Sequence, residues 1–426
     1  MITKKKIVIF AHFAGSEHHG MVFGHYYLAL EWVKLGHQVT IIASGFAHTR
    51  QRQPVLSSRI TEEYINGIRY LWVKTPGYDG KGRVGRVLNL VSFAFQIWAL
   101  PLPVEHADLV ICSSHCPFAI HGSHRFARRH RAKLVFEVRD LWPLTLIELG
   151  GASPHNPFIS VMQRSEDFAY RTSDRVVSVL PGAAKYMESR GMQPGKFAYI
   201  PNGINLDSHQ SGLELESDET LERINLLRRE GKFLLGYAGR FVASNTLELL
   251  LEALALCNRP DIHLVLLGDG YLREQLEAQS VALGLSGRVS FMGVVNKSQV
   301  VPLLSKIDAL YLGLVKKPIF RFGVSPTKLN DYFMAARPII YSVEAPDNVI
   351  EISGGGVSCP AESVEAIATA IQRIHAMTPS ERDRMGLAGR KWLLEHRTYE
   401  RLASKFLDVA FSDVAHSPFE LPSESF

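Results

Sequence analysis

Residues 6–44 read KIVIFAHFAGSEHHGMVFGHYYLALEWVKLGHQVTIIAS, and this stretch predicts the fold of the first half of the chain. The apolar run Lys6–Phe10 is typical of a buried strand, Val22–Leu35 has helical spacing, and Gln38–Ala43 is a second apolar run. Gly36 marks the end of the helix. A strand, a helix and a strand in this order predict two parallel strands joined by a helical crossover.

The alternation of short apolar runs with amphipathic helical stretches continues through most of the chain. It predicts an α/β protein with two Rossmann-like, doubly wound parallel sheets, whose ligands bind at the carboxyl ends of the strands. Two such domains facing each other would enclose a cleft. The other expected strands are Leu109–Cys112, Leu134–Val138, Arg175–Val179, Phe197–Ile200, Leu234–Tyr237, His263–Leu267, Val289–Phe291, Ala309–Gly313, Ile339–Ser342 and Gly356–Ser358.

A polar stretch rich in glutamate separates the two series of strands. The chain has 426 residues, which is too long for one ordinary hydrophobic core. After the last strand, two further segments have helical spacing, Ser380–His396 and Tyr399–Phe411. We therefore predict an N-terminal domain over residues 1–205, a C-terminal domain over 206–378, and closing helices within 379–426.

The charge and cysteine content exclude several classes of protein. Lys and Arg number 47 against 42 Asp and Glu, and a net charge of +5 is too weak a bias for a dedicated nucleic-acid binder, so no nucleic-acid partner is expected. Phosphate-bearing small molecules or an anionic membrane surface are enough to explain it. Four cysteines in so long a chain form no disulfide framework, so we expect a reduced, cytoplasmic protein. The apolar run after the basic start of the chain is too short for a signal peptide.

The loop after the first strand lies where a helix begins, a position at which backbone N–H groups attract anions. It runs from Ala11 to Gly20 and contains Gly15. The loop is not G-x-G-x-x-G, and the second strand runs out at Ser44 without a carboxylate to hold a ribose, so a dinucleotide site is disfavoured. A plain strand-to-helix turn that needs its glycines is the alternative.

Charged residues follow another predicted strand in the sequence FEVRDLWP, residues 136–143. An unpaired charge is costly to bury, so Glu137, Arg139 and Asp140 are expected to pair or to bind a ligand. Arg139 paired with Glu137 or with Asp140 would brace the loop; alternatively, Arg139 and Asp140 face a ligand. Asn202, in the turn that ends the first domain, is a further candidate for a ligand contact.

Two turns follow strands of the second domain. Small residues in Gly236–Arg240, GYAGR, permit a close backbone approach, so that Arg240 can bind a diphosphate through two hydrogen bonds. An ordinary surface arginine is the alternative. Gly268-Asp269-Gly270 is a tight turn that we interpret as mainly architectural.

Residues 321–331, RFGVSPTKLND, are the most informative loop. The pattern predicts Ser325 as the N-cap of a helix and Pro326 as its first residue, with Lys328 in the first turn. A cation there opposes the helix dipole by about 0.3–1 kcal/mol unless an anion binds at the same place. Lys328 and the N–H groups of that turn would then both point at a phosphate. Asp331, three residues on and on the same face, would accept hydrogen bonds from vicinal hydroxyls.

Motifs for metals and common cofactors are missing from the sequence. It contains no D-x-D for a metal-bound diphosphate, no G-x-x-x-x-G-K-[ST] and no H-E-x-x-H. The spacing of Cys112 and Cys116, with no second Cys/His pair nearby, is also poor for zinc. We therefore expect neither a metal ion nor another cofactor.

Two segments of the first domain favour contact with an anionic membrane surface. Residues 82–102, GRVGRVLNLVSFAFQIWALPL, are apolar but interrupted by Arg86 and Asn89, which is typical of an interfacial helix rather than a span. Residues 125–131, RFARRHR, add a basic cluster that anionic lipids attract. The alternatives are packing of the first segment inside the domain and a solvated helix face for the second.

Several of these motifs together resemble a known family. GHQVT at 36–40, EVRDLWP at 137–143, IPNGI at 200–204, GDG at 268–270 and the motif at 321–331 are similar to those of glycosyltransferase family 4, which has the GT-B fold, in a bacterial branch that assembles capsule and O-antigen. The resemblance covers nearly the whole chain. It implies transfer of a sugar from a nucleoside diphosphate sugar to a lipid-linked or glycan acceptor, with retention of configuration and without a metal.

The resemblance also implies roles for individual residues. Arg240 and Lys328 would hold the diphosphate, and Asp331 the ribose. Gly15 would approach the phosphates or the transferred sugar, with Asn202 and Asn245 as further donor contacts. Arg139 and Asp140 are the candidate catalytic residues on the acceptor side. The closing helices within 379–426 would pack back on the N-terminal domain.

Three positions depart from the family pattern. Gly323 stands where the first of two carboxylates is usual, and Arg139 stands where a histidine usually precedes the aspartate. Asn245 replaces the lysine that usually follows the arginine by five residues. Lys328 would then supply the missing cation.

Two other functions fit the same residues. A sugar-nucleotide epimerase on the same fold would isomerise a nucleotide sugar without any acceptor. A non-catalytic partner in polysaccharide assembly would bind a nucleotide tightly without turnover.

Overall fold

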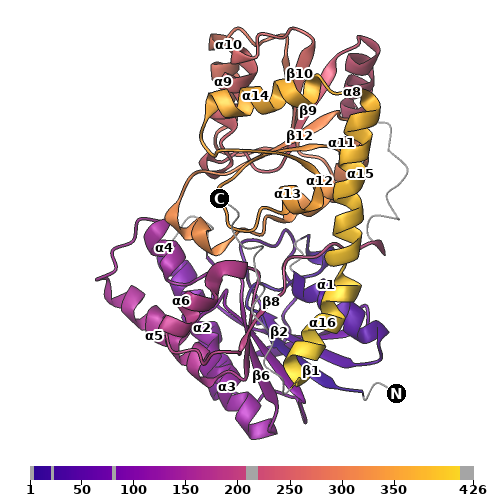
Figure 1. The fold of residues 1–426 in the computed structure, drawn as a ribbon. Helices are drawn as coiled ribbons and strands as arrows, with labels where there is room; N and C mark the ends of the chain where they lie inside the picture. The colour runs from indigo at the N-terminus through magenta and orange to yellow at the C-terminus, as the bar shows by residue number, and fades with distance from the viewer. Residues whose placement is uncertain (1–3, 21–23, 79–82, 208–218, 413–426) are drawn as a thin grey trace. The chain divides into compact units, whose positions relative to one another are not determined.

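The chain forms two compact α/β units, each with its own sheet (Figure 1). The computed structural model describes residues 4–20, 24–78, 83–207 and 219–412. The N-terminal unit comprises Met1–Asn202 and Tyr399–Phe426, and the C-terminal unit comprises Gly203–Thr398. The predicted class, with two doubly wound parallel sheets, is confirmed.

The N-terminal unit has an eight-stranded sheet in the order β3-β4-β2-β1-β5-β6-β7-β8. All neighbouring strands are parallel except β3 and β4. Burial on both faces explains why its parallel strands read as continuous apolar runs. The strands are β1 Lys6–Phe10, β2 Gln38–Ser44, β3 Ile60–Ile65, β4 Ile68–Val73, β5 Leu109–Ser113, β6 Lys133–Val138, β7 Arg175–Ser178 and β8 Phe197–Tyr199.

The β3–β4 hairpin was not predicted from the sequence. Its loop is Asn66-Gly67, and both residues have positive φ, 48° and 79°. Ile65 pairs with Ile68 across this two-residue turn. Asn-Gly is the dipeptide that such a turn prefers, because both positions lie in the left-handed region. The signal was therefore present in the sequence.

Helices cover the sheet of the N-terminal unit, and its core includes Ile7, Ile9, Trp32 and Tyr70. The helix α16 belongs to this unit: the indole N–H of Trp32 donates to the backbone oxygen of Ala403 at 3.0 Å. The helices are α1 Gly24–Lys34, α2 Arg83–Ala99, α3 Ala119–His130, α4 Leu144–Glu148, α5 Pro157–Thr172, α6 Ala184–Ser189 and α16 Tyr399–Phe411.

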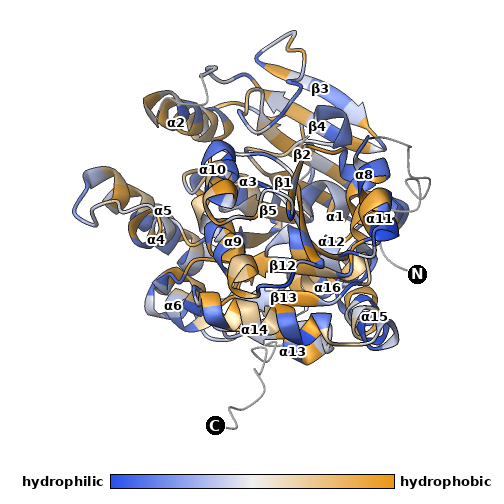
Figure 2. Cartoon of the chain, turned by 90° about the horizontal axis from the view of Figure 1, so that it is seen from above, coloured by the Kyte–Doolittle hydropathy of each residue, from blue (hydrophilic) through white to orange (hydrophobic). Residues whose placement is uncertain are grey.

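The C-terminal unit has a six-stranded, fully parallel sheet in the order β11-β10-β9-β12-β13-β14. In Figure 2, helices such as α14 and α15 alternate blue and orange along their turns, as expected for helices buried on one side. The strands are β9 Phe233–Ala238, β10 Ile262–Leu267, β11 Val289–Gly293, β12 Ala309–Gly313, β13 Ile339–Ser342 and β14 Gly356–Cys359. The helices are α8 Glu219–Arg229, α9 Leu247–Leu256, α10 Arg273–Ala282, α11 Lys297–Leu304, α12 Thr327–Met334, α13 Val349–Ser353, α14 Val364–His375 and α15 Pro379–His396.

The helix α15 belongs to the C-terminal unit, whereas the sequence predicted closing helices that pack on the N-terminal domain. Gly386 and Gly389 allow this helix to lie close to its neighbours: a Cβ on Gly386 would be 2.0 Å from the backbone oxygen of Ala336. The ring of Trp392 also contacts that of Phe333 in α12. The pattern of the sequence indicated a helix here, but not which unit receives it. Residues 413–426, the end of the predicted closing segment, lie outside the described residues.

None of the helices in the described ranges is both long enough and apolar enough to cross a bilayer. The segment 82–102, for which we predicted an interfacial helix, contains α2, and Gly82 lies outside the described residues.

The close packing of α15 predicts the effect of a single methyl group. Gly386→Ala is expected to lower the free energy of unfolding by about 1–3 kcal/mol, because the new Cβ would overlap the oxygen of Ala336. Helix propensity alone predicts the opposite sign, a gain of up to about 1 kcal/mol. Urea denaturation followed by circular dichroism measures the change. Gly287→Ala, with open space around the added Cβ, is the control, and a more stable Gly386→Ala protein would contradict this packing.

Candidate functional site

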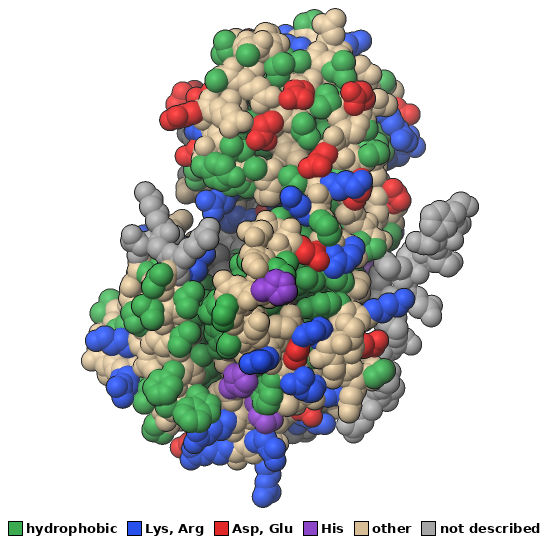
Figure 3. Space-filling view, turned by 90° about the vertical axis from the view of Figure 1, so that its left-hand side faces the viewer, with side chains coloured by type: hydrophobic (Ala, Val, Ile, Leu, Met, Phe, Trp, Pro, Cys, Tyr) green, Lys and Arg blue, Asp and Glu red, His purple; other side chains and the backbone are tan. Residues whose placement is uncertain are grey.

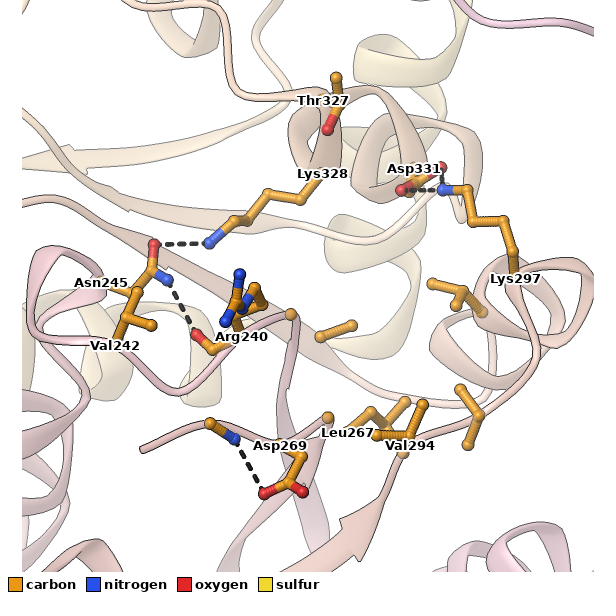
Figure 4. A pocket seen from close by; sticks show the side chains of 16 residues that line it. Arg240, Val242, Asn245, Leu267, Asp269, Val294, Lys297, Thr327, Lys328 and Asp331 are labelled. Atoms are coloured by element: carbon orange, nitrogen blue, oxygen red, sulfur yellow. Dashed lines mark hydrogen bonds and ion pairs between the residues drawn. The ribbon is translucent and has the colours of Figure 1, made fainter. Parts of the chain in front are cut away.

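A pocket of about 790 Å³ lies in the C-terminal unit at the carboxyl ends of β9 and β10 (Figure 4). Its walls are the turn after β9, the turn after β10, and residues near the starts of α11 and α12. Ligands of doubly wound sheets ordinarily bind at this edge. Four of the residues singled out from the sequence line the pocket: Arg240, Asn245, Lys328 and Asp331.

Glycines bring the two turns into contact. Gly239 and Gly268 have φ values of 150° and 134°, which favour glycine. A Cβ on Gly268 would lie 1.9 Å from the oxygen of Gly239, and one on Gly270 would lie 2.2 Å from that of Phe241. Phe241 N donates to Asp269 O at 2.9 Å and joins the turns. The turn at 268–270 is therefore architectural, as the sequence indicated. Because its glycines have no side chains, backbone atoms form this wall of the pocket.

The ammonium group of Lys328 points into the pocket from the first turn of α12 (Figure 4). Its Nζ donates to Oδ1 of Asn245 at 2.7 Å and to the hydroxyl of Tyr237 at 3.1 Å. Both acceptors are neutral, and burial lowers the pKa of Lys328 to about 8. A desolvated cation thus lies beside the N–H groups of a helix start, where a bound anion would be stabilised by both.

The helix α12 begins one residue later than the sequence pattern indicated. Ser325 was expected as the N-cap, but Pro326 holds that position and Thr327 is the first helical residue. The ring of Pro326 fixes φ at −68°, which fits either position, whereas its ψ of 123° is extended. Lys328 still lies in the first turn.

Asn245 connects the main chain of Arg240 to Lys328. Its Nδ2 donates to the backbone oxygen of Arg240 at 2.9 Å, while its Oδ1 accepts from Lys328. An amide can donate and accept at once, which a lysine at this position could not. The exposed side chain of Arg240 extends toward the same part of the pocket as Nζ of Lys328 (Figure 4). The structure therefore brings these three residues together.

Asp331 is held by a residue that the sequence analysis missed. Nζ of Lys297, the first residue of α11, lies 2.6 Å and 2.5 Å from the two carboxylate oxygens of Asp331. Asp331 is buried, whereas the side chain of Lys297 is 68% exposed, so solvent weakens the pair to at most about 1 kcal/mol. The pair orients the carboxylate and leaves the lysine side chain largely in solvent.

Lys297 carries the same sequence signal as Lys328. It follows Asn296, the N-cap of α11, and so places a cation in the first turn of a helix. Such a cation opposes the helix dipole. In the first turn of α11, Lys297 thus has the same position as Lys328 in the first turn of α12.

Charged residues of the N-terminal unit form a chain of hydrogen bonds. Oε2 of Glu137, in β6, pairs with Nε2 of His25 in α1, and Oε1 accepts from Nη1 of Arg139 at 3.2 Å. Nη2 of Arg139 donates to Oδ1 of Asn202. Of the two pairings that the sequence left open for Arg139, the structure contains the one with Glu137. It also brings Asn202 next to Arg139.

This hydrogen-bond network gives the neighbouring carboxyl groups of Glu137 and Asp140 different pKa values. Burial alone would raise the pKa of Glu137, but His25 and Arg139 outweigh it and lower that pKa to about 2. Burial raises the pKa of Asp140 to about 6, against the opposing effect of Arg139. His115, just after β5, has its pKa lowered by burial and further by Arg139. His115 follows a predicted strand, so the sequence held a signal for it. No motif pointed to His25.

Gly15 lies in the loop between β1 and α1 of the N-terminal unit and is buried. Its backbone oxygen accepts from the hydroxyl of Tyr70 at 2.9 Å, and that of Ala14 accepts from Nε of the buried Arg50 at 3.0 Å. The guanidinium of Arg50 also lies over the ring of Trp72. The side chains of Tyr70 and Arg50 thus hold this loop in place, and neither was predicted from the sequence.

In the described part of the chain, no group of three or more His, Cys, Asp or Glu side chains is arranged to hold a metal ion. The four cysteines, Cys112, Cys116, Cys257 and Cys359, are free thiols.

Two family models match most of the chain between them. Residues 20–203 match the model described as "Glycosyl transferase 4-like domain". Residues 218–392 match the model described as "Glycosyl transferases group 1". The first range corresponds to the N-terminal unit, and the second lies within the C-terminal unit.

The chain is also similar to a curated protein, the lipopolysaccharide core biosynthesis glycosyltransferase LpsE of Rhizobium meliloti. The two are 27% identical over 174 residues, which make up 41% of this chain and 48% of LpsE. The chain thus spans about half the length of the curated relatives that it matches.

Solved structures resemble the chain over nearly its whole length. Sucrose-phosphate synthase from Thermosynechococcus elongatus has a TM-score of 0.69 at 17% identity, covering 95% of this chain and 98% of that one. Anabaena HepE, in complex with UDP and glucose, has a TM-score of 0.62 at 14% identity, covering 96% and 100%. These likenesses show the fold. The chain thus has the GT-B fold and consists of a glycosyl transferase 4-like domain followed by a domain of the glycosyl transferases group 1.

Proposed function

We propose that this glycosyltransferase transfers a sugar from a nucleoside diphosphate sugar, bound in the pocket of the C-terminal unit, to a lipid-linked or glycan acceptor. One observation carries the proposal: Lys328 and Arg240 extend into one pocket beside the start of α12, over a floor of glycine backbone. Relatives of known structure support the donor class, since HepE has been solved with UDP-glucose.

The pocket residues suit a diphosphate leaving group. Negative charge grows on the bridging oxygen as the bond to the sugar breaks, and fixed cations and helix N–H groups stabilise it. Lys328 and Arg240 fill this role, while Asn245 holds Lys328 in place. The carboxylate of Asp331 then accepts hydrogen bonds from the ribose hydroxyls. Lys297 shares or releases the carboxylate at small cost, because the pair is largely exposed on the lysine side.

On the N-terminal unit, we propose that Asp140 and Arg139 act on the acceptor. The pKa of about 6 for Asp140 leaves it ionised at neutral pH and close enough to neutrality to take a proton from an acceptor hydroxyl. Arg139 is fixed by Glu137 and Asn202, so its position is set before any ligand arrives. Gly15 and Asn202, also of this unit, remain predicted contacts of the donor.

The biological setting is part of the same proposal. We propose that the enzyme works in the assembly of surface polysaccharides such as capsule or O-antigen, at the inner face of the cell membrane. The name of LpsE, a lipopolysaccharide core glycosyltransferase, supports this setting. We further propose that the sugar keeps its anomeric configuration and that no metal ion takes part, since Lys328 and Arg240 supply positive charge at the diphosphate.

Lys328→Ala is expected to weaken the binding of a nucleoside diphosphate by roughly tenfold or more, because it removes a charge-assisted hydrogen bond. A thermal-shift screen of UDP, GDP, dTDP and ADP first identifies the nucleotide, since a bound ligand raises the melting temperature. Calorimetry with that nucleotide, in EDTA, then gives the affinity. Turnover of the matching nucleotide sugars should be abolished.

Two variants control this experiment. Lys391→Ala removes an exposed lysine on α15 and should bind like the wild type, while Lys328→Arg keeps the charge and should retain part of the affinity. Unchanged turnover in Lys328→Ala would exclude the pocket as the donor site. Isomerised nucleotide sugar appearing without any acceptor would instead favour the epimerase.

Asp331→Asn is expected to separate ribose recognition from phosphate recognition. It should weaken nucleoside diphosphate binding by roughly tenfold, because the amide loses charge-assisted acceptance from the ribose hydroxyls, and leave the affinity for inorganic pyrophosphate unchanged. Lys328→Ala should weaken both ligands. Calorimetric titration with each ligand tests this, and equal losses for both ligands in Asp331→Asn would contradict the ribose role.

Asp140→Asn is expected to lower kcat by roughly 100-fold while leaving the dissociation constant of the nucleotide unchanged. A base must be ionised, so the wild-type rate should rise with pH through about 6 and then level off, and the variant should lack that rise. The pH profile of kcat is the deciding measurement. An Asp140→Asn enzyme with the wild-type profile would show that another group takes the proton.

A further inference from the structure

Helix α2 of the N-terminal unit is apolar on two sides. On one side Phe93, Ala94 and Ile97 are buried. On the other side, five hydrophobic residues are between 45% and 72% exposed: Val84, Leu88, Val91, Phe95 and Trp98. Their spacing of four and three residues places all five on one helix face, which we call the α2 stripe. Scattered exposed hydrophobic residues are ordinary, whereas a continuous stripe indicates an interaction surface.

Arginines of the neighbouring helix α3 border the end of the α2 stripe. The two helices pack closely at Gly122, where an added Cβ would lie 2.8 Å from a carbon of Ile97. The guanidinium of Arg125 lies 5.0 Å from the ring centroid of Trp98. Arg128 and Arg129, on the next turn, are exposed. In Figure 3, hydrophobic side chains gather on the lower part of the face shown, with Lys and Arg side chains at their margin.

We propose that the α2 stripe and the arginines of α3 form a surface that docks on an anionic lipid bilayer. The stripe would enter the boundary between headgroups and acyl chains, with α2 lying along the membrane. The arginines would contact lipid phosphates, and Trp98 would lie at the interface that tryptophan favours.

The distribution of charge favours lipid over another protein. Neither α2 nor α3 contains an aspartate or a glutamate, and their charged residues are all basic. If a second copy of the chain bound through the same surface, it would bring arginines of like charge together in an interface. An anionic bilayer supplies the opposite charge over the whole surface.

The dimensions fit docking rather than insertion. With 17 residues, α2 is about 25 Å long. Asn89, on its buried side, donates to Thr75 Oγ1 at 2.9 Å and to Pro76 O at 2.7 Å, which ties the helix to the unit. A helix fixed in this way presents its stripe along the surface. This inference extends the proposed function, in which the acceptor is borne by a membrane, but it does not depend on the donor pocket.

Vesicle co-sedimentation of the full chain tests the proposal. We expect binding to vesicles of equal amounts of phosphatidylglycerol and phosphatidylcholine, weakened by salt, and weaker binding to phosphatidylcholine alone. Leu88→Ser with Phe95→Ser should reduce binding by at least about tenfold. Arg128→Gln with Arg129→Gln should reduce binding to the anionic vesicles by roughly tenfold.

Matched variants on the C-terminal unit serve as controls. Leu256→Ser with Leu387→Ser removes two leucines of similar exposure, and Arg373→Gln with Arg384→Gln removes two exposed arginines. Both pairs should bind vesicles like the wild type. Every variant should keep the thermal shift produced by the nucleotide, which reports folding.

Three results would overturn the inference: no binding of the wild type to anionic vesicles, equal binding by the α2 variants, or a solution dimer that Leu88→Ser with Phe95→Ser converts to monomer. The last result, seen by light scattering, would assign the stripe to a second copy of the chain. If nucleotide binding ignores Lys328→Ala while vesicle binding follows α2, the proposed function fails and the docking surface stands.

Discussion

The ammonium group of Lys328 is the feature on which the proposed donor pocket depends. It is a desolvated cation in the first turn of α12, and the two groups that accept its hydrogen bonds, the amide of Asn245 and the hydroxyl of Tyr237, are neutral. Burial therefore lowers the pKa of Lys328 to about 8, and among the residues that the structure describes no carboxylate opposes the shift. A diphosphate would supply the missing countercharge, so the cost of holding the cation is recovered when the ligand binds.

In the N-terminal unit, by contrast, charged side chains of the candidate site are paired with one another. Arg139 is paired with Glu137, which is also bonded to His25, so these charges are compensated before a ligand binds. These pairs fix the position of the Arg139 side chain. The pKa of Glu137 is about 2, whereas that of Asp140 is about 6. One unit thus carries uncompensated positive charge suited to an anion, and the other carries a fixed network beside one carboxyl group that titrates near neutrality.

Much of the candidate site was predictable because its residues have positions that local rules single out. Lys328 was identified as a cation in a first helical turn, and Arg240 and Asp140 because they follow strand ends. Lys297, in the first turn of α11, and His115, shortly after β5, have equivalent positions but were not predicted. His25 was not predictable in this way, since its partner Glu137 lies 112 residues away and no local pattern records that distance.

The sequence by itself determined the class of the fold, most of the strands and the position of the lysine at the start of α12, because periodicity and helix capping are local properties. Even the β3–β4 hairpin was encoded locally, in Asn66-Gly67. Only the tertiary structure decided that α15 belongs to the C-terminal unit, that Lys297 holds Asp331, and that the second apolar face of α2 is exposed. These outcomes depend on which surfaces meet in the folded chain, and close contacts such as that of Gly386 with Ala336 join residues that no periodicity connects.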